Sequence, residues 1–138
     1  MNKEIARQKF ENALESCENS FEKFFLSRFF DLSFSYTEDT CTVEFLVEEY
    51  MYNPQGTLHG GVISFILDVS MGHLCKKVLG TAVTLEMKTQ YLRPIRSGKA
   101  RCQASFLKKG RTVLSIESRL WDEHGELAAM ATATWMRV

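Results

Sequence analysis

Apolar and polar residues alternate along two early stretches of the chain and four late ones. A period of two is typical of strands that place one face against a core. The early stretches are residues 30–36 and 41–47, separated by the turn-like sequence TEDT. The late stretches are residues 83–91, 99–106, 113–120 and 129–138. We therefore predict six strands, two before and four after the middle of the chain.

The segment between the two groups of strands, residues 59–79, has almost no polar side and predicts one long helix. Lys76 and Lys77 suit the negative end of such a helix, and Gly80 suits its C-cap. A helix with apolar residues all round must be wrapped by protein. The apolar positions are Val62, Ile63, Phe65, Ile66, Leu67, Val69 and Met71.

The order of these elements predicts an α+β fold, with an antiparallel sheet wrapped around one long central helix. The glycines of KKGR and EHGE stand where a short hairpin needs a left-handed residue. A more polar helix is predicted over residues 2–19, followed by the Phe-rich sequence FEKFFLSRFF. The length of 138 residues suits a single domain, residues 1–138, in which residues 1–29 form an N-terminal helical segment.

Composition narrows the setting. With 45% apolar and 25% charged residues the chain is an ordinary globular protein. The four cysteines show no CxxC spacing and the start is charged, so we expect reduced thiols and a cytoplasmic protein. No apolar run approaches the roughly 20 residues of a membrane span. The chain is therefore expected to have no membrane partner. None of the three histidines has HExxH spacing, so we expect no metal.

The net charge of zero hides an asymmetry along the chain. Residues 1–50 hold 11 acids and 5 bases, whereas residues 87–116 hold 8 bases and no acid. The basic stretch is a candidate anion-binding surface, although strand residues that simply face water would give the same pattern. It has no recognition helix and few aromatic residues, so we expect no nucleic-acid partner.

Candidate chemistry gathers in NPQGTLHGGVISFILD, residues 53–68. Gly60 and Gly61 lack a Cβ, so a ligand can approach the backbone closely at the predicted helix start. The first-turn N–H groups there have no partner within the helix and carry the positive end of its dipole. Such donors stabilise an oxyanion in acyl transfer, although the glycines could equally serve tight packing.

Asp68 is the one carboxylate in the apolar helix. An unpaired ionised carboxylate among apolar residues is costly, and its helical neighbours Ser64 and Gly72 carry no positive charge. Asp68 is therefore a candidate functional residue, unless a distant Arg pairs with it. His73 and Cys75 point away from each other on a helix and make a poor nucleophile–base pair.

Gly60 and Asp68 are too far apart to act together within one chain. Their separation of eight residues is about 12 Å along a helix, whereas reacting groups must come within about 3.5 Å. Two antiparallel copies, with a twofold axis near residues 62–64, would bring the oxyanion donors of one subunit to the acid of the other. This geometry predicts an obligate dimer with two composite sites.

The spacing Asn-x5-His-Gly-Gly-x6-Asp resembles that of the hotdog-fold acyl-CoA thioesterases. The phenylacetate-degradation type, related to the 4-hydroxybenzoyl-CoA thioesterases, is the most similar. The likeness covers residues 30–138, where TLEMKTQYLRP, KKGR and GELAAMATATW also stand at strands and turns of that family. The resemblance implies a homodimer or a dimer of dimers.

The resemblance also implies roles for the motif residues. Asn53 corresponds to the amide that holds the thioester or the attacking water. His59 corresponds to the histidine that shapes the helix start and orients that amide. Gly60 corresponds to the residue whose N–H polarises the thioester carbonyl, and Gly61 to the second motif glycine.

Asp68 corresponds to the catalytic carboxylate, as nucleophile or as general base on water. Thr84 corresponds to a hydroxyl residue beside it on the next strand. Where the 4-hydroxybenzoyl type has a Thr one turn after the acid, this chain has Gly72, so a hydroxyl role falls to Thr84 alone. The residues implied in binding the phosphates of coenzyme A are Arg93, Lys108, Lys109 and Arg111.

The sequence thus predicts an acyl-CoA thioesterase that needs no cofactor, because coenzyme A is part of its substrate. The alternative is a non-catalytic acyl-CoA binding or sensing module on the same fold. A hydratase or dehydratase is disfavoured, because such enzymes pair a catalytic His with an acid in a different arrangement. The acyl group is left open by the sequence.

Overall fold

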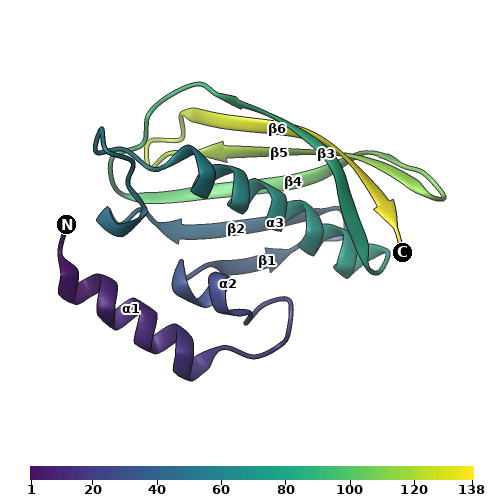
Figure 1. The fold of residues 1–138 in the computed structure, drawn as a ribbon. Coiled ribbons are helices and arrows are strands. Elements are labelled where there is room, and N and C mark those ends of the chain that lie inside the picture. The colour runs from purple at the N-terminus through teal and green to yellow at the C-terminus, as the bar shows by residue number, and fades with distance from the viewer.

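A six-stranded antiparallel sheet curls behind one long helix in the computed structural model, which describes residues 1–138 (Figure 1). The predicted α+β fold is confirmed, and its arrangement is that of a hotdog fold. In space the strands follow the order β1-β2-β4-β5-β6-β3. The helices are α1 (Lys3–Ser16), α2 (Phe25–Phe29) and α3 (Gly60–Val78), with a short 3₁₀ turn at Glu49–Met51. The strands are β1 (Ser33–Tyr36), β2 (Thr40–Leu46), β3 (Ala82–Tyr91), β4 (Lys99–Lys109), β5 (Val113–Trp121) and β6 (Leu127–Arg137).

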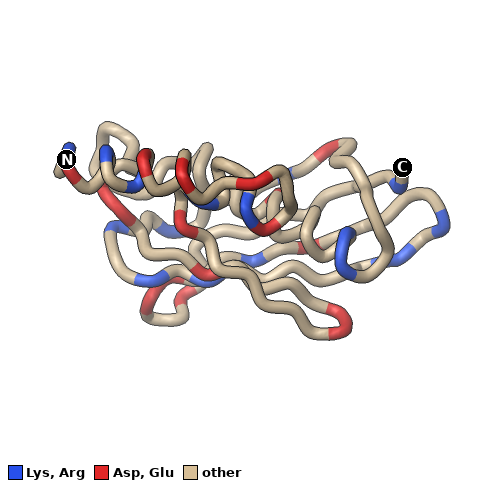
Figure 2. The backbone as a smooth tube through the Cα atoms, turned by 90° about the horizontal axis from the view of Figure 1, so that it is seen from below, with Lys and Arg blue, Asp and Glu red and all other residues tan.

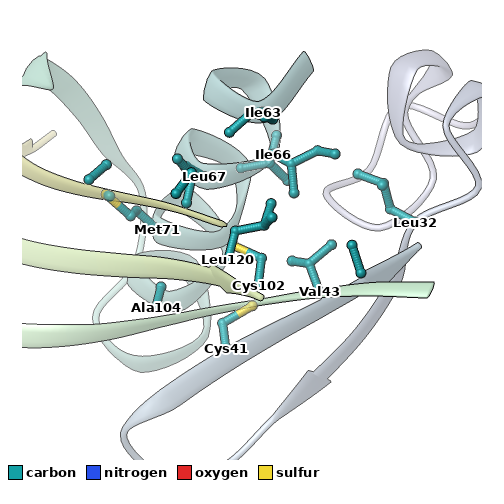
Figure 3. Close-up of a cluster of buried hydrophobic side chains, with 14 of the residues drawn as sticks. Leu32, Cys41, Val43, Ile63, Ile66, Leu67, Met71, Cys102, Ala104 and Leu120 are labelled. Carbon is teal, nitrogen blue, oxygen red and sulfur yellow. The ribbon is translucent and has the colours of Figure 1, made fainter. Parts of the chain in front are cut away.

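The core lies between α3 and the concave face of the sheet. Side chains spaced three and four apart on α3, such as Ile63, Ile66 and Leu67, point toward the strands (Figure 3). They meet the inward residues of the central strands, among them Val43 and Leu120, which are fully buried. This packing fixes α3 on the sheet and leaves the opposite side of the helix to form the site.

β3 is an edge strand with one unpaired side. It pairs with β6 alone, and the register shifts between Thr84 and Glu86, which leaves Leu85 in a bulge. Its apolar residues Val83, Leu85 and Tyr91 are 42%, 52% and 53% exposed. The alternation predicted a strand over residues 83–91, but alternation marks the two faces of a strand and does not show whether an edge is covered.

The N-terminal segment consists of two helices joined by a loop. The predicted helix over residues 2–19 is α1, which begins after Asn2, whose side chain caps the first turn. The Phe-rich sequence holds the short helix α2, which lies within residues 1–29, although its own bounds were not predicted. α1 packs against α2, beside the sheet edge formed by β1 (Figure 1).

The two predicted hairpin glycines differ in their backbone conformation. Gly125, in the β5–β6 turn, has a φ of 77°, as predicted. Gly110, in the β4–β5 turn, is not left-handed, and the prediction was wrong there. A Cβ on Gly110 would lie 2.2 Å from the carbonyl oxygen of Val113. Glycine is needed at this turn because two backbone segments approach closely, and not because φ is positive.

Candidate active site

The start of α3 leaves one backbone N–H group free. His59 precedes the helix, and its Nδ1 accepts a hydrogen bond from the Gly61 N–H at 2.8 Å. The N–H groups of Val62 and Ile63 donate to the His59 carbonyl. The Gly60 N–H donates to no atom of the chain. It is thus the single unoccupied donor in the first turn, at the positive end of the helix dipole.

Gly61 allows His59 to cap the helix in this way. A Cβ on Gly61 would lie 3.0 Å from the His59 Nδ1, a distance at which the ring would have to move. No hydrogen bond joins His59 to Asn53, so His59 contacts the helix start and not the amide that the resemblance assigns to it.

Asp68 is half-buried on the side of α3 that faces away from the core. The Thr84 hydroxyl donates to its Oδ1 at 2.7 Å, so the contact implied by the resemblance is present. None of the salt bridges involves Asp68, so no Arg of the same chain pairs with it. The second carboxylate oxygen has no hydrogen-bond partner and is free to meet a substrate or water.

The Asn53 side chain makes its hydrogen bonds within its own turn. Its Oδ1 accepts from the N–H groups of Gln55 and Thr57 at 3.0 and 3.1 Å. Its Nδ2 donates to the Thr57 hydroxyl at 2.9 Å. These contacts hold the loop that leads into α3 and leave one Nδ2 hydrogen of the amide without a partner in the chain.

Tyr91 is a candidate site residue that the sequence pattern did not single out. Its hydroxyl lies within hydrogen-bond distance of the Ser64 hydroxyl and donates to the Gly60 carbonyl at 3.2 Å. Its ring covers Gly60 so closely that a Cβ there would be 3.3 Å from Tyr91 Cε1. Tyr91 is 27 residues from Ser64 in the chain, and only the folded sheet brings them together.

Within one chain, Gly60 and Asp68 line two different cavities. A cavity of about 290 Å³ at the start of α3 is lined by Asn53, Gly60, Tyr91 and Arg93, among others. A second cavity, of about 400 Å³, lies beside Asp68 farther along the helix. The predicted oxyanion donor and the predicted acid therefore line different hollows, as their separation along the helix requires.

The predicted basic residues divide between the two ends of the molecule. Arg93 lines the cavity at the start of α3 and lies 3.8 Å from Glu126. Lys108, Lys109 and Arg111 lie at the β4–β5 turn, at the end that carries the C-terminus (Figures 1 and 2). No cavity joins these two groups within one chain.

Other chemistry receives little support. The four cysteines are free thiols, and burial raises the pKa of the Cys75 thiol to about 11, so it stays protonated near neutral pH. No three His, Cys, Asp or Glu side chains gather as a set of metal ligands. Among the helices, none combines the length and the apolar character that crossing a membrane requires.

The wrapped helix and its curled sheet place the chain in the hotdog class of proteins. The chain belongs to the thioesterase superfamily, matched over residues 55–129, which is more than half of its length, and it is thereby a thioester hydrolase by class. It is 32% identical over 98 residues to the medium/long-chain acyl-CoA thioesterase YigI of Escherichia coli, covering 59% of this chain. The match spans 63% of YigI, which is less than two thirds of that relative.

Solved structures show the same fold. The BH2602 protein of Bacillus halodurans, solved with CoA, matches with a TM-score of 0.89 and 22% identity, over 99% of this chain and 93% of that one. A phenylacetic acid degradation-related protein of Ralstonia eutropha matches with a TM-score of 0.76 and 24% identity, over 81% and 89%. The BH2602 match includes the N-terminal helices as well as the sheet.

Proposed function

We propose that the protein is an acyl-CoA thioesterase that hydrolyses a CoA thioester to a free acid and CoA. Each active site combines Asp68 of one subunit with the Gly60 N–H of a second. Membership of the thioesterase superfamily and the likeness to YigI support the reaction and the substrate class. The observation that carries the shared site is the course of β3 along α3.

β3 runs antiparallel along α3 and contacts both halves of the site. Thr84 near its start meets Asp68, and Tyr91 at its end meets Gly60. Pairing of two β3 edges about a twofold axis at Met87 would set the Thr84 end of one strand beside the Tyr91 end of the other. Asp68 would then lie next to Gly60 of the partner subunit.

The character of the β3 edge supports this pairing. An exposed strand of 10 residues presents unpaired backbone groups that readily join another strand. Exposed Val83 and Leu85 would be buried by the second copy. A twofold axis at Met87 also sets Glu86 opposite Lys88, and opposite charges across a strand pair are favourable. Such dimers could assemble further into a dimer of dimers.

The proposed reaction uses the free groups of the site. The Gly60 N–H donates to the thioester oxygen as it gains negative charge in the tetrahedral intermediate. Asp68 either takes a proton from the attacking water, or attacks the carbonyl carbon itself to form a mixed anhydride that water then hydrolyses to the free acid and the Asp68 carboxylate. Thr84 holds one carboxylate oxygen and so orients the other. The sulfur leaves as the CoA thiolate and takes up a proton, and no metal or cofactor enters the reaction.

The basic residues supply the proposed binding of CoA. Arg93 lies beside the Gly60 end of one subunit, and Lys108, Lys109 and Arg111 lie at the far end of the sheet. The antiparallel arrangement of two subunits would bring these opposite ends closer together. Charge-assisted contacts to the CoA phosphates are then available from both subunits.

Replacing Asp68 tests the proposal. Asp68→Asn keeps the size and the Thr84 contact of the side chain but loses the nucleophile or base, so kcat should fall by about 100-fold or more. The measurement is thiol release from a panel of acyl-CoA esters, with melting temperature as a check of the fold. Glu11→Gln is the matched control, because Glu11 is exposed on α1 and takes part in no ion pair or side-chain hydrogen bond.

The same assay distinguishes a thioesterase from a non-catalytic binding module. A non-catalytic acyl-CoA binding module would be stabilised against heat by acyl-CoA esters without releasing thiol, in wild type and variant alike. Hydrolysis by Asp68→Asn at the wild-type rate would show that another group carries the reaction.

A further inference from the structure

The cavity beside Asp68 has an outer wall that does not come from the thioesterase-family region of the chain. Its inner side is formed by α3 and by the adjoining ends of β3 and β6. Its outer side is the α1–α2 loop, residues 17–24, which precedes the family match at residues 55–129. The lining residues on the loop are Asn19, Ser20, Phe21 and Phe24.

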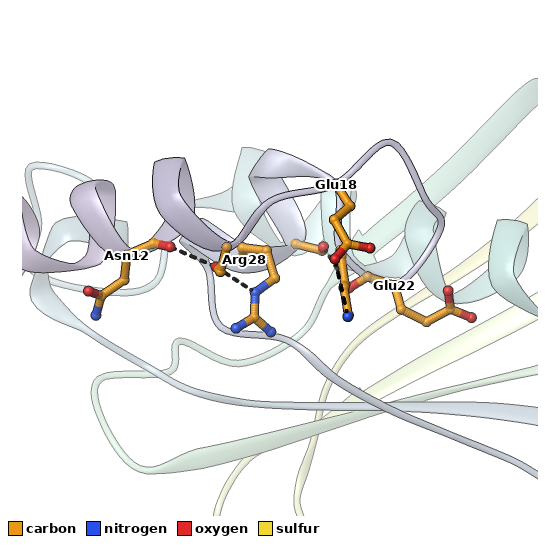
Figure 4. Close-up of polar contacts among 7 residues, drawn as sticks. Asn12, Glu18, Glu22 and Arg28 are labelled. Atoms are coloured by element: carbon orange, nitrogen blue, oxygen red, sulfur yellow. Dashed lines mark hydrogen bonds and ion pairs between the residues drawn. The ribbon is translucent and has the colours of Figure 1, made fainter.

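This loop is fastened at both ends (Figure 4). At the α1 end, the Arg28 Nε donates to the Ser16 hydroxyl at 3.0 Å, and that hydroxyl donates to the Asn12 carbonyl. At the α2 end, the buried Ser27 hydroxyl contacts the carbonyls of Glu22 and Phe24 at 3.0 and 2.7 Å. The loop is therefore a fixed wall and not a loose connection.

The loop is closed on itself and docked on the helix. The Glu18 N–H donates to the Lys23 carbonyl at 2.8 Å. The Phe21 ring packs edge-on against buried His73, with ring centroids 5.5 Å apart, and Lys76 lies over its face. Phe24 meets Phe65 of α3 in the same edge-on manner. Two aromatic rings thus hold the wall against α3.

The inner side of the cavity depends on the absence of a side chain at Gly72. A Cβ there would lie 3.1 Å from Cη2 of Trp135, so a larger residue would fill this space or push the indole aside. The glycine at position 72 thus keeps this hollow open. Half of the lining residues are apolar, including Val69, Ala82 and Trp135.

We propose that the α1–α2 loop is the acyl-selecting wall, and that this cavity takes an apolar acyl group of medium length. The proposal rests on the proposed thioesterase function, because Asp68 at the mouth of the cavity marks the position of the thioester. The acyl group would lie along α3 and end against Phe21 and His73.

The length of the cavity sets the size of the group. From Asp68 to His73 the helix advances five residues, about 7.5 Å. An extended chain gains about 1.2 Å per bond, since a peptide residue of three bonds spans about 3.5 Å. About six bonds therefore reach the loop, so acyl groups of about six to eight carbons fit. The cavity beside Asp68 has a volume of about 400 Å³, whereas a cavity of roughly 150 Å³ is enough to bind a benzene molecule. It is therefore large enough for an acyl group of more than six carbons.

Removing Phe21 tests the selecting wall. In wild type, kcat/KM should be highest for hexanoyl- or octanoyl-CoA and lower for acetyl- and palmitoyl-CoA. In Phe21→Ala the ratio of octanoyl- to acetyl-CoA turnover should fall by about 10-fold, because the end of the chain loses its contact, while palmitoyl-CoA gains. Acetyl-CoA serves as the internal standard, since its acyl group is too short to reach the loop.

Phe10→Ala is the matched control. Phe10 is a similarly exposed ring on α1 that packs on Phe25 and Phe29 and does not line the cavity. Across the acyl-CoA panel, the relative kcat/KM values of Phe10→Ala should equal those of wild type. A Ser20→Leu variant, which fills the cavity from the loop side, should shift preference toward shorter acyl groups.

The outcomes separate the two proposals. Asp68-dependent hydrolysis with the same acyl profile in wild type, Phe21→Ala and Ser20→Leu would overturn the selecting wall and leave the thioesterase function standing. If no acyl-CoA is hydrolysed, but octanoyl-CoA raises the melting temperature of wild type more than that of Phe21→Ala, the function fails and the binding cavity stands.

Discussion

At the scale of single residues, the helix start shows how one side chain can define a site without touching substrate. His59 occupies the Gly61 N–H with its ring and the next two N–H groups with its carbonyl. Only the Gly60 N–H remains open. A backbone donor cannot be read from residue identity, and here it follows from counting which donors are already used.

Replacing Asn53 tests whether its side chain supports the stability of the fold or the turnover of substrate. Its side chain makes three hydrogen bonds within its turn, so Asn53→Ala should lower the free energy of unfolding by about 1–2 kcal/mol. The measurement is urea unfolding. Asn12→Ala is the control, because the Asn12 side chain is exposed on α1 and makes no hydrogen bond.

If Asn53→Ala were as stable as wild type but slow in turnover, the amide would act on substrate, as the resemblance implied. A stability loss with near-normal kcat would place Asn53 in the architecture of the turn.

His73 should make stability depend on pH. It is 3% exposed and stacks on Phe34, with Nδ1 2.9 Å from the Tyr36 hydroxyl, and its Nε2 has no hydrogen-bond partner. Burial lowers the pKa of His73 below its ordinary 6.5, and the Glu22 carboxylate and Phe21 carbonyl offset part of this shift. Below pH 6.5 the unfolded chain therefore binds more protons than the folded one, and the free energy of unfolding falls as pH falls.

The measurement compares melting temperatures at about pH 7.5 and about pH 5.5. His73→Gln should show a smaller difference between the two pH values than wild type does. His124→Gln, at a side chain that is 77% exposed, should behave like wild type. An identical pH dependence in His73→Gln and wild type would contradict the assignment to His73.

At the scale of elements, regular periodicity could be read from the sequence and unpaired edges could not. The central helix was predictable because its apolar residues leave no polar side, and the strands because they alternate over a buried face. The bounds of α2 were not predictable, since its aromatic residues are too crowded to show a period. The exposed edge of β3 depends on the order of strands in space, which local pattern does not contain.

The same distinction holds for the site. Gly60 and Asp68 could be singled out because both lie on one helix, where spacing gives distance. Tyr91 and the α1–α2 loop reach the site through folding over long chain separations. Their side chains look like ordinary strand and loop residues in the sequence.

At the scale of the whole molecule, the shared site predicts that two inactive variants restore each other. Gly60→Pro removes the free N–H, and Pro suits the first position of a helix, particularly after the extended His59. The Tyr91 ring must shift by a few tenths of an ångström to admit the added side chain. Mixed dimers of Gly60→Pro and Asp68→Asn would contain one intact site, built from the Asp68 of the first variant and the Gly60 of the second. Unfolding the two together and refolding them should recover about a quarter of wild-type activity, because random pairing makes half the dimers mixed.

Each variant refolded alone is the control and should stay inactive. If mixing recovers nothing although ultracentrifugation shows mixed dimers, the acid and the amide act within one chain or not together. If wild type is a monomer at full activity, the composite site is excluded.

β3 contacts the acid at one end and the helix start at the other, so the two halves of the chemistry share one mechanical support. A slip of this strand by a single position past β6 would carry the Thr84 hydroxyl off Asp68 and the Tyr91 ring off Gly60 together. The bulge at Leu85 opposes such a slip, because it permits only one alignment of the two strands. A substitution that removes the bulge at Leu85 could therefore abolish activity while every helix and strand remains in place.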